Sequence, residues 1–175
     1  MLIDDAESLP SSTAYRHRFG SLIKAYRLVG FVPSHDYTYL EINKSLREIH
    51  PKLLERIVAQ LREAGAQVED SSDVLRINRE YSASIALSRY RHTQAGASRW
   101  LVRFRSDHRP DITIVARMDA ANQTPEDYYL IPHIDLDGPT LRLAQYNGAG
   151  IDTYRFENLD YFVGLSLRQK VEVIP

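Results

Sequence analysis

The sequence contains no cysteine, and this absence excludes disulfide bonds, thiolate catalysis and cysteine-based zinc sites. Lysine is scarce too, because the 22 basic residues include only four lysines: Lys24, Lys44, Lys52 and Lys170. No run of about 18 apolar residues occurs, and no charged-then-apolar leader opens the chain. We therefore expect a soluble, cytoplasmic protein with no membrane partner.

The composition is sufficient for a full hydrophobic core. The chain has 175 residues, of which 43% are hydrophobic and 10% aromatic. This length predicts one compact domain with a small appendage. We assign residues 1–35 to a helical hairpin and residues 36–175 to an α+β domain.

Charge is unevenly placed along a chain whose formal net charge is only −1. Residues 76–117 contain nine arginines against three acidic residues, whereas residues 119–160 contain eight acidic residues against two arginines. One interpretation is that the two segments pair within the fold, as scattered surface ion pairs do. The other is that the arginines bind phosphate, for which the guanidinium fork is well suited.

The segment 14–31 (AYRHRFGSLIKAYRLVGF) contains four basic residues and no acidic one. Apolar side chains recur in it at spacings of four and three, which predicts one face of a helical hairpin. Gly20 ends the first helix, Ser21 caps the second over residues 21–29, and Gly30 closes it. The predicted apolar face consists of Tyr15, Phe19, Leu22, Tyr26 and Val29.

This hairpin is helix-turn-helix-like, and its basic side chains are expected to face outward. They are Arg16, Arg18, Lys24 and Arg27. Ser21 and the first backbone N–H groups of the second helix are placed to hold a phosphate oxygen. The alternative is a packing hairpin whose polar side happens to be cationic.

The rest of the chain changes from helical to strand periodicity. Residues 36–43 predict a short strand or an extended lead-in, and residues 43–66 predict an amphipathic helix that Pro51 splits and Gly65 ends. A largely antiparallel meander is predicted over 73–78, 81–92, 99–105, 111–118 and 127–136. A closing helix over 158–169 and a short strand over 171–174 follow. One face of the sheet is expected to be core and the other to carry arginines.

Parts of the sequence resemble two groups of DNA-associated proteins. Residues 15–31 match the pattern Y-x-x-R-F-G-S-L-x-x-A-Y-x-L-V-G-F, which resembles a short DNA-associated helical repeat found beside homing endonucleases. Residues 10–43, 99–136 and 152–162 (DTYRFENLDYF) resemble the C-terminal region of bacterial serine recombinases of the resolvase/invertase-like type. That resemblance covers most of the chain and implies DNA binding, with strand exchange performed by a separate N-terminal catalytic domain. Nothing in this sequence resembles the catalytic domain.

A second hypothesis treats residues 43–136 as a divergent PD-(D/E)XK-like, metal-dependent nuclease. That chemistry requires an acid and a lysine two residues apart on one strand, so that both face the metal and the attacking water. No lysine of this sequence has an acid two residues before it. His133 and Asp135 alternate in PHIDL and form a possible metal pair that Asp111 or Asp119 could complete, but a polar strand edge explains them better, because only two ligands are local. We expect no cofactor and no metal site.

The sequence therefore predicts an accessory DNA-binding module of a recombinase-like mobile-element protein, not itself catalytic. Its partner is double-stranded DNA, and a homo-oligomer is possible. A protein–protein interaction or dimerisation module, held together by the oppositely charged segments, remains a third hypothesis. The predicted DNA-contacting residues are Arg16, Arg18, Ser21, Lys24, Arg27, Arg89, Arg91, Arg103, Arg105 and Arg117.

Overall fold

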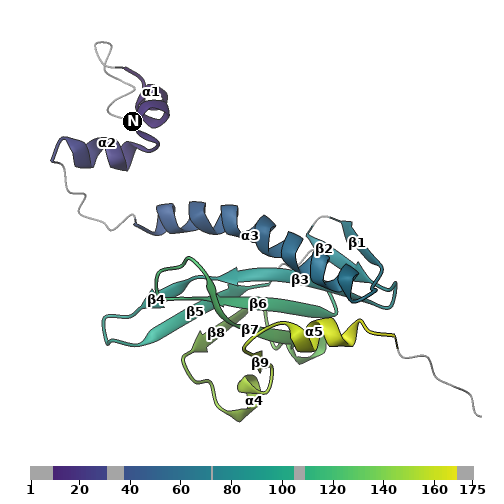
Figure 1. Ribbon diagram of the computed structural model, residues 1–175. Helices are drawn as coiled ribbons and strands as arrows, with labels where there is room; N and C mark the ends of the chain where they lie inside the picture. The colour runs from purple at the N-terminus through teal and green to yellow at the C-terminus, as the bar shows by residue number, and fades with distance from the viewer. Residues whose placement is uncertain (1–9, 31–37, 72, 105–108, 169–175) are drawn as a thin grey trace, which may run out of the picture. The chain divides into compact units, whose positions relative to one another are not determined.

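The computed structural model describes residues 10–30, 38–71, 73–104 and 109–168, whose helices and strands are drawn in Figure 1. The chain divides into two compact units, Met1–Glu41 and Ile42–Pro175. The domain boundary predicted from the sequence lies slightly earlier, after residue 35. The first unit contains a helical hairpin, and the second contains the sheets.

The hairpin of the first unit consists of α1 (Ser12–Phe19) and α2 (Leu22–Leu28). Gly20 has a φ of 77°, the left-handed conformation that ends a helix, so the predicted break is confirmed. Tyr15 and Phe19 are stacked one turn apart, with ring centroids separated by 6.4 Å. The expectation that Val29 lies on the apolar face is wrong, because α2 ends before it and Val29 is 79% exposed.

The helix α3 (Thr38–Glu63) is continuous, and Pro51 lies inside it. The prediction that Pro51 splits this segment is therefore wrong, as is the prediction of a strand or extended lead-in over residues 38–43. Residues 36–37 lie outside the described ranges. Proline removes one helical hydrogen bond, and burial of the apolar side chains that follow it offsets this cost.

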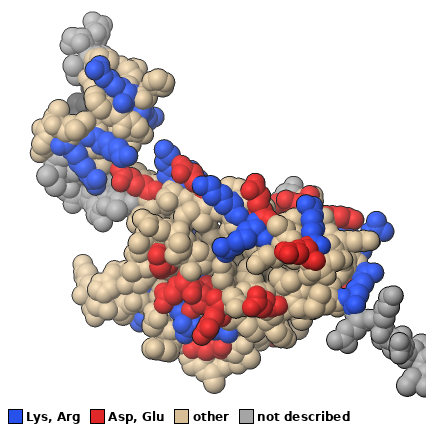
Figure 2. Space-filling model, viewed as in Figure 1, with Lys and Arg blue, Asp and Glu red and all other residues tan. Residues whose placement is uncertain are grey.

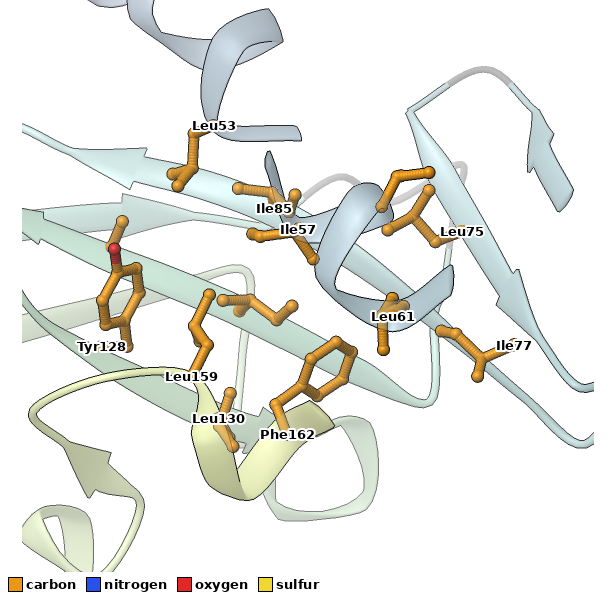
Figure 3. Packing of buried hydrophobic residues seen from close by; sticks show 14 of the residues in the cluster. Leu53, Ile57, Leu61, Leu75, Ile77, Ile85, Tyr128, Leu130, Leu159 and Phe162 are labelled. Atoms are coloured by element: carbon orange, nitrogen blue, oxygen red, sulfur yellow. The ribbon is translucent and has the colours of Figure 1, made fainter. Parts of the chain in front are cut away.

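Those apolar side chains form one stripe of α3. Leu53, Ile57 and Leu61 are buried and point toward the larger sheet (Figure 3). Gly65 follows the helix with a φ of 88°, as expected for a helix stop.

The larger sheet has six strands in the order β1-β2-β3-β6-β7-β9. They are β1 (Val68–Ser71), β2 (Val74–Ile77), β3 (Tyr81–Ser88), β6 (Ile112–Met118), β7 (Pro125–Pro132) and β9 (Arg155–Phe156). All neighbouring strands are antiparallel except β3 and β6, which are parallel.

The smaller sheet has three antiparallel strands in the order β4-β5-β8. They are β4 (Tyr90–His92), β5 (Ser98–Arg103) and β8 (Thr140–Ala144). The remaining elements are the 3₁₀ turn η1 (His133–Asp135), α4 (Ala149–Asp152) and α5 (Asp160–Leu165).

The connection between β3 and β6 corrects the predicted meander. The chain leaves the larger sheet after Ser88, forms the β4–β5 hairpin in the smaller sheet, and returns as β6 beside β3. The predicted single strand over residues 81–92 is therefore two strands in different sheets. Parallel neighbours need such a crossover, whereas a meander needs only tight turns.

The second unit has three layers, with α3 and α5 on one face of the larger sheet and the smaller sheet on the other (Figure 1). In the first core, Leu159 and Phe162 lie beside the α3 stripe and Leu130 of β7 (Figure 3). In the second core, Trp100 and Leu143 of the smaller sheet pack on β6 and β7. The strand β6 is consequently buried on both faces, which corrects the prediction that one face is open.

The predicted fold class is confirmed: helices come first, a mainly antiparallel sheet follows, and a C-terminal helix comes last. The closing helix spans only Asp160–Leu165 of the predicted 158–169. The predicted strand over residues 171–174 lies outside the described ranges.

Candidate nucleic-acid interface

The hairpin places its four predicted basic side chains in solvent. Arg16 and Arg18 of α1 and Lys24 and Arg27 of α2 are exposed, and Figure 2 shows blue side chains gathered over this unit. Within the described ranges, none of the four forms an ion pair with an acidic side chain. The guanidinium of Arg18 lies 5.8 Å from the centre of the Phe19 ring. The hairpin therefore presents cations that the described acids do not neutralise.

Ser21 performs the capping role predicted for it. The backbone N–H of Lys24 donates to Ser21 Oγ at 3.1 Å, which satisfies one of the free N–H groups at the start of α2. That N–H group is then occupied within the protein. Ser21 therefore supports the hairpin structurally, and the basic side chains remain the groups available to a ligand.

A second cationic surface lies on the smaller sheet. Side chains alternate along a strand, and Trp100 and Val102 of β5 point into the core, so their neighbours point outward. The strand register carries this outward face onto β4 and β8. The exposed arginines on it are Arg91, Arg99, Arg103 and Arg142, which we call the arginine face.

The register brings these arginines close to one another. Arg91 and Arg99 lie directly opposite on β4 and β5, and Arg142 lies opposite Leu101, diagonal to Arg99. Like charges in opposite positions destabilise a sheet. The three strands contain no Asp or Glu, and no ion pair involves the arginine face in the described part of the chain. Fold stability therefore does not explain this arrangement.

The prediction that Arg117 contacts DNA is wrong, because this residue is buried. Its side chain is 0% exposed, because β6 is covered by the smaller sheet. Its Nε donates to Asp127 Oδ1 at 2.7 Å, and its guanidinium carbon lies 4.3 Å from the centre of the Trp100 ring. Arg155 adds a second ion pair to Asp127. Arg117 is therefore a core residue and unavailable to DNA.

The polar network continues from this pair toward α4. Tyr129 donates its hydroxyl to Asp152 Oδ1 at 2.7 Å, and burial followed by this hydrogen bond raises the pKa of Tyr129 to about 12. Hydrogen bonds from the Asn147 backbone and from Tyr129 lower the pKa of Asp152 to about 2. The network holds the end of β8 against β7, since Asn147 Oδ1 also accepts the Ala144 N–H.

Another predicted residue, Arg89, lies away from the arginine face. Arg89 is half-buried where the chain changes sheets, and it donates to Asn43 Oδ1 of α3 at 3.3 Å. Arg105 lies outside the described residues. Of the predicted sheet residues, the structure therefore brings together Arg91 and Arg103.

Arg99 and Arg142 complete the arginine face but are missing from the predicted set. Arg99 alternates with Trp100 and was recognisable from strand periodicity alone. Arg142 belongs to the acidic segment, and residues 140–144 (TLRLA) alternate in the manner of a strand. Only the pairing of β8 with β5 shows that Arg142 joins the other three.

The possible metal pair does not form a cluster. Asp135 accepts a hydrogen bond from the Tyr154 hydroxyl at 2.6 Å, and Asp111 accepts from the Ser82 hydroxyl at 2.7 Å. Within the described ranges, no group of three or more His, Asp or Glu side chains is arranged to hold a metal ion. In the same ranges, no helix has the length and apolar character needed to cross a membrane.

Comparison with known proteins does not assign the chain to a family. No protein-family profile matches the sequence. No curated protein matches it either. Among solved structures, the chain is similar to a bacterial homing endonuclease, I-Ssp6803I, with a TM-score of 0.39 and 12% sequence identity; the match covers 67% of this chain and 90% of the endonuclease chain.

Proposed function

We propose that this protein binds double-stranded DNA through the phosphate backbone. The observation that carries the proposal is the arginine face, where four exposed arginines share one sheet surface without an acidic neighbour on their strands. Guanidinium groups bind phosphate oxygens through two parallel hydrogen bonds, and binding releases the counterions condensed on DNA. A polyanion removes the repulsion between Arg91 and Arg99.

The hairpin provides a second set of contacts in this proposal. Lys24 and Arg27 lie three residues apart on α2, so they share one helix face. Contacts of this kind position a protein on DNA and do not select a sequence. The proposal therefore specifies backbone binding and no base preference.

The biological role we propose is that of an accessory module in a recombinase-like mobile-element protein. This finer statement rests on the resemblance of residues 10–43, 99–136 and 152–162 to the C-terminal region of bacterial serine recombinases. In such a role the module anchors the protein on DNA while another domain performs strand exchange.

The test is a titration of a labelled 30-base-pair duplex, monitored by fluorescence anisotropy, at several salt concentrations. We expect binding that weakens linearly on a log–log plot of affinity against salt. Absence of duplex binding at low salt would reject the proposal.

Incubation with supercoiled plasmid and Mg²⁺ or Mn²⁺ tests the nuclease alternative, since an active nuclease nicks the plasmid. A mass by size exclusion that falls as salt rises, without DNA binding, would favour the charge-driven interaction module.

A further inference from the structure

A cavity of about 630 Å³ opens beside the arginine face. It lies where β5 ends and β6 begins, and α3 and the turn after η1 contribute to its walls. Arg103, the last residue of β5, belongs both to the arginine face and to the cavity lining. Cavities of roughly 300–1,000 Å³ are typical of small-ligand sites. A DNA strand bound to the arginine face therefore lies beside a cavity whose volume is typical of small-ligand sites.

Several polar side chains lining this cavity lack partners. Thr113 is only 5% exposed, and its hydroxyl has no hydrogen bond within the described ranges. The His133 ring, the Asp137 carboxylate and the Arg109 guanidinium also line the cavity, and none of them has a hydrogen bond or ion pair with a described residue. His133 is half-buried and Asp137 and Arg109 are exposed, so water reaches these groups and a ligand can take its place. These groups are available to a ligand.

The rest of the lining is mixed, and its polar side chains are Asp73, Ser84 and His50. Phe104, Pro110 and Leu136 contribute apolar walls, and Phe104 supplies an aromatic ring. His50 closes the α3 side, where its Nε2–H donates to the Ile85 carbonyl at 3.1 Å. A cavity that combines apolar walls with polar side chains suits a flat heterocycle carrying polar edges. Two guanidinium groups near it suit an attached phosphate.

We propose that this cavity binds one unpaired nucleotide of a DNA strand held on the arginine face. The base lies against Phe104 and hydrogen-bonds to Thr113, His133 and Asp137, while its phosphates contact Arg103 and Arg109. An unpaired base avoids the cost of leaving a base pair, so the site selects distorted DNA over regular duplex. This inference rests on the proposed backbone binding and adds a preference for DNA structure to it.

The test compares two duplexes of one sequence, one fully paired and one carrying a single unpaired 2-aminopurine. Base–aromatic stacking is worth enough that the wild-type protein should bind the second duplex about tenfold more tightly. The emission of 2-aminopurine should rise as the base leaves its stacked neighbours. Thr113→Val and Asp137→Asn should each reduce the preference to below about threefold while leaving affinity for the paired duplex close to wild type.

Glu157→Gln is the matched control for Asp137→Asn, because it removes one exposed carboxylate outside the cavity lining. It should retain the tenfold preference. Equal affinity for the two duplexes together with unchanged emission would overturn the inference and leave backbone binding intact. Failure to bind either duplex would reject the proposed function itself. Thermal unfolding of each variant excludes loss of fold as the cause.

Discussion

Replacing two residues of the arginine face, in the variant R99Q/R142Q, tests backbone binding quantitatively. Both side chains are exposed, and neither has an acidic partner within the described ranges. Arg99 makes one hydrogen bond, to the Ser98 carbonyl at 2.9 Å. The change should therefore leave the fold intact. It should even relieve the repulsion between Arg99 and Arg91.

The magnitude follows from counterion release. Each neutralised phosphate contributes about 0.9 to the slope of log affinity against log salt, so four contacts give a slope of about −3.6. Raising salt from about 50 to 200 mM should then weaken wild-type binding about 150-fold through this surface. With two contacts the slope is about −1.8, and the same change weakens binding about 12-fold. Hairpin contacts add equally to both proteins, so the difference of about 1.8 remains.

The assay is the anisotropy titration at four or more salt concentrations, with R76Q/R168Q as the control. Both control residues are exposed and outside the arginine face, and Arg168 is paired with Glu80 at 3.1 Å. The control removes the same net charge from outside the arginine face, and its melting temperature shows whether loss of the Arg168–Glu80 pair has changed the fold. Equal slopes for wild type and R99Q/R142Q would refute the reasoning, as would a control that lowers the slope by the same amount.

Three further predictions concern the hairpin and the buried network. The variant K24Q/R27Q should lower the salt slope by up to about 1.8 with an unchanged melting temperature, measured by anisotropy and circular dichroism. Asp127→Ala should cost about 3–5 kcal/mol in urea unfolding, because it leaves the Arg117 charge buried and unpaired, whereas R117L/D127L should recover most of that loss. Asp152 has a folded pKa of about 2 against an ordinary value of 3.8, so its stabilisation is present above about pH 4 and is lost as pH falls toward 2. The urea midpoint of Asp152→Asn should therefore fall less than that of wild type across this window.

The elements that depend on local signals are those that the sequence predicts well. The break at Gly20, the Ser21 cap and the stop at Gly65 each follow from the conformation or hydrogen bonding of one residue. Pro51 shows the limit of a local rule, because the apolar stripe of α3 continues past it and burial outweighs the lost hydrogen bond.

Strand order is not a local property, and the predicted meander is wrong where β3 pairs with β6 instead of with the next strand of the chain. Alternation places side chains on two faces but does not say which strand lies beside which, so the parallel pairing of β3 with β6 is invisible in the sequence. The same limit applies to the candidate site. Arg91 and Arg103 are identifiable from their charge, but Arg142 reaches them only through the pairing of β8 with β5.

The different environments of Arg99 and Arg117 follow from the layer in which each strand lies. Both alternate with apolar residues in basic strands, and the sequence gives no reason to separate them. The strand β5 belongs to the outer layer, so the side of it opposite Trp100 meets solvent and Arg99 remains free to bind an anion. The strand β6 is central and covered on both faces, so a charge at Arg117 requires a partner, which Asp127 supplies from the directly opposite position on β7. Asp127, which belongs to the acidic segment 119–160, thus neutralises the buried Arg117. The strands β4, β5 and β8 contain no acidic residue that could neutralise the arginine face. Among the described residues, the buried Arg117 of the larger sheet has an acidic partner, whereas the four arginines of the arginine face in the smaller sheet have none. This difference fits binding to an external polyanion better than internal charge balance.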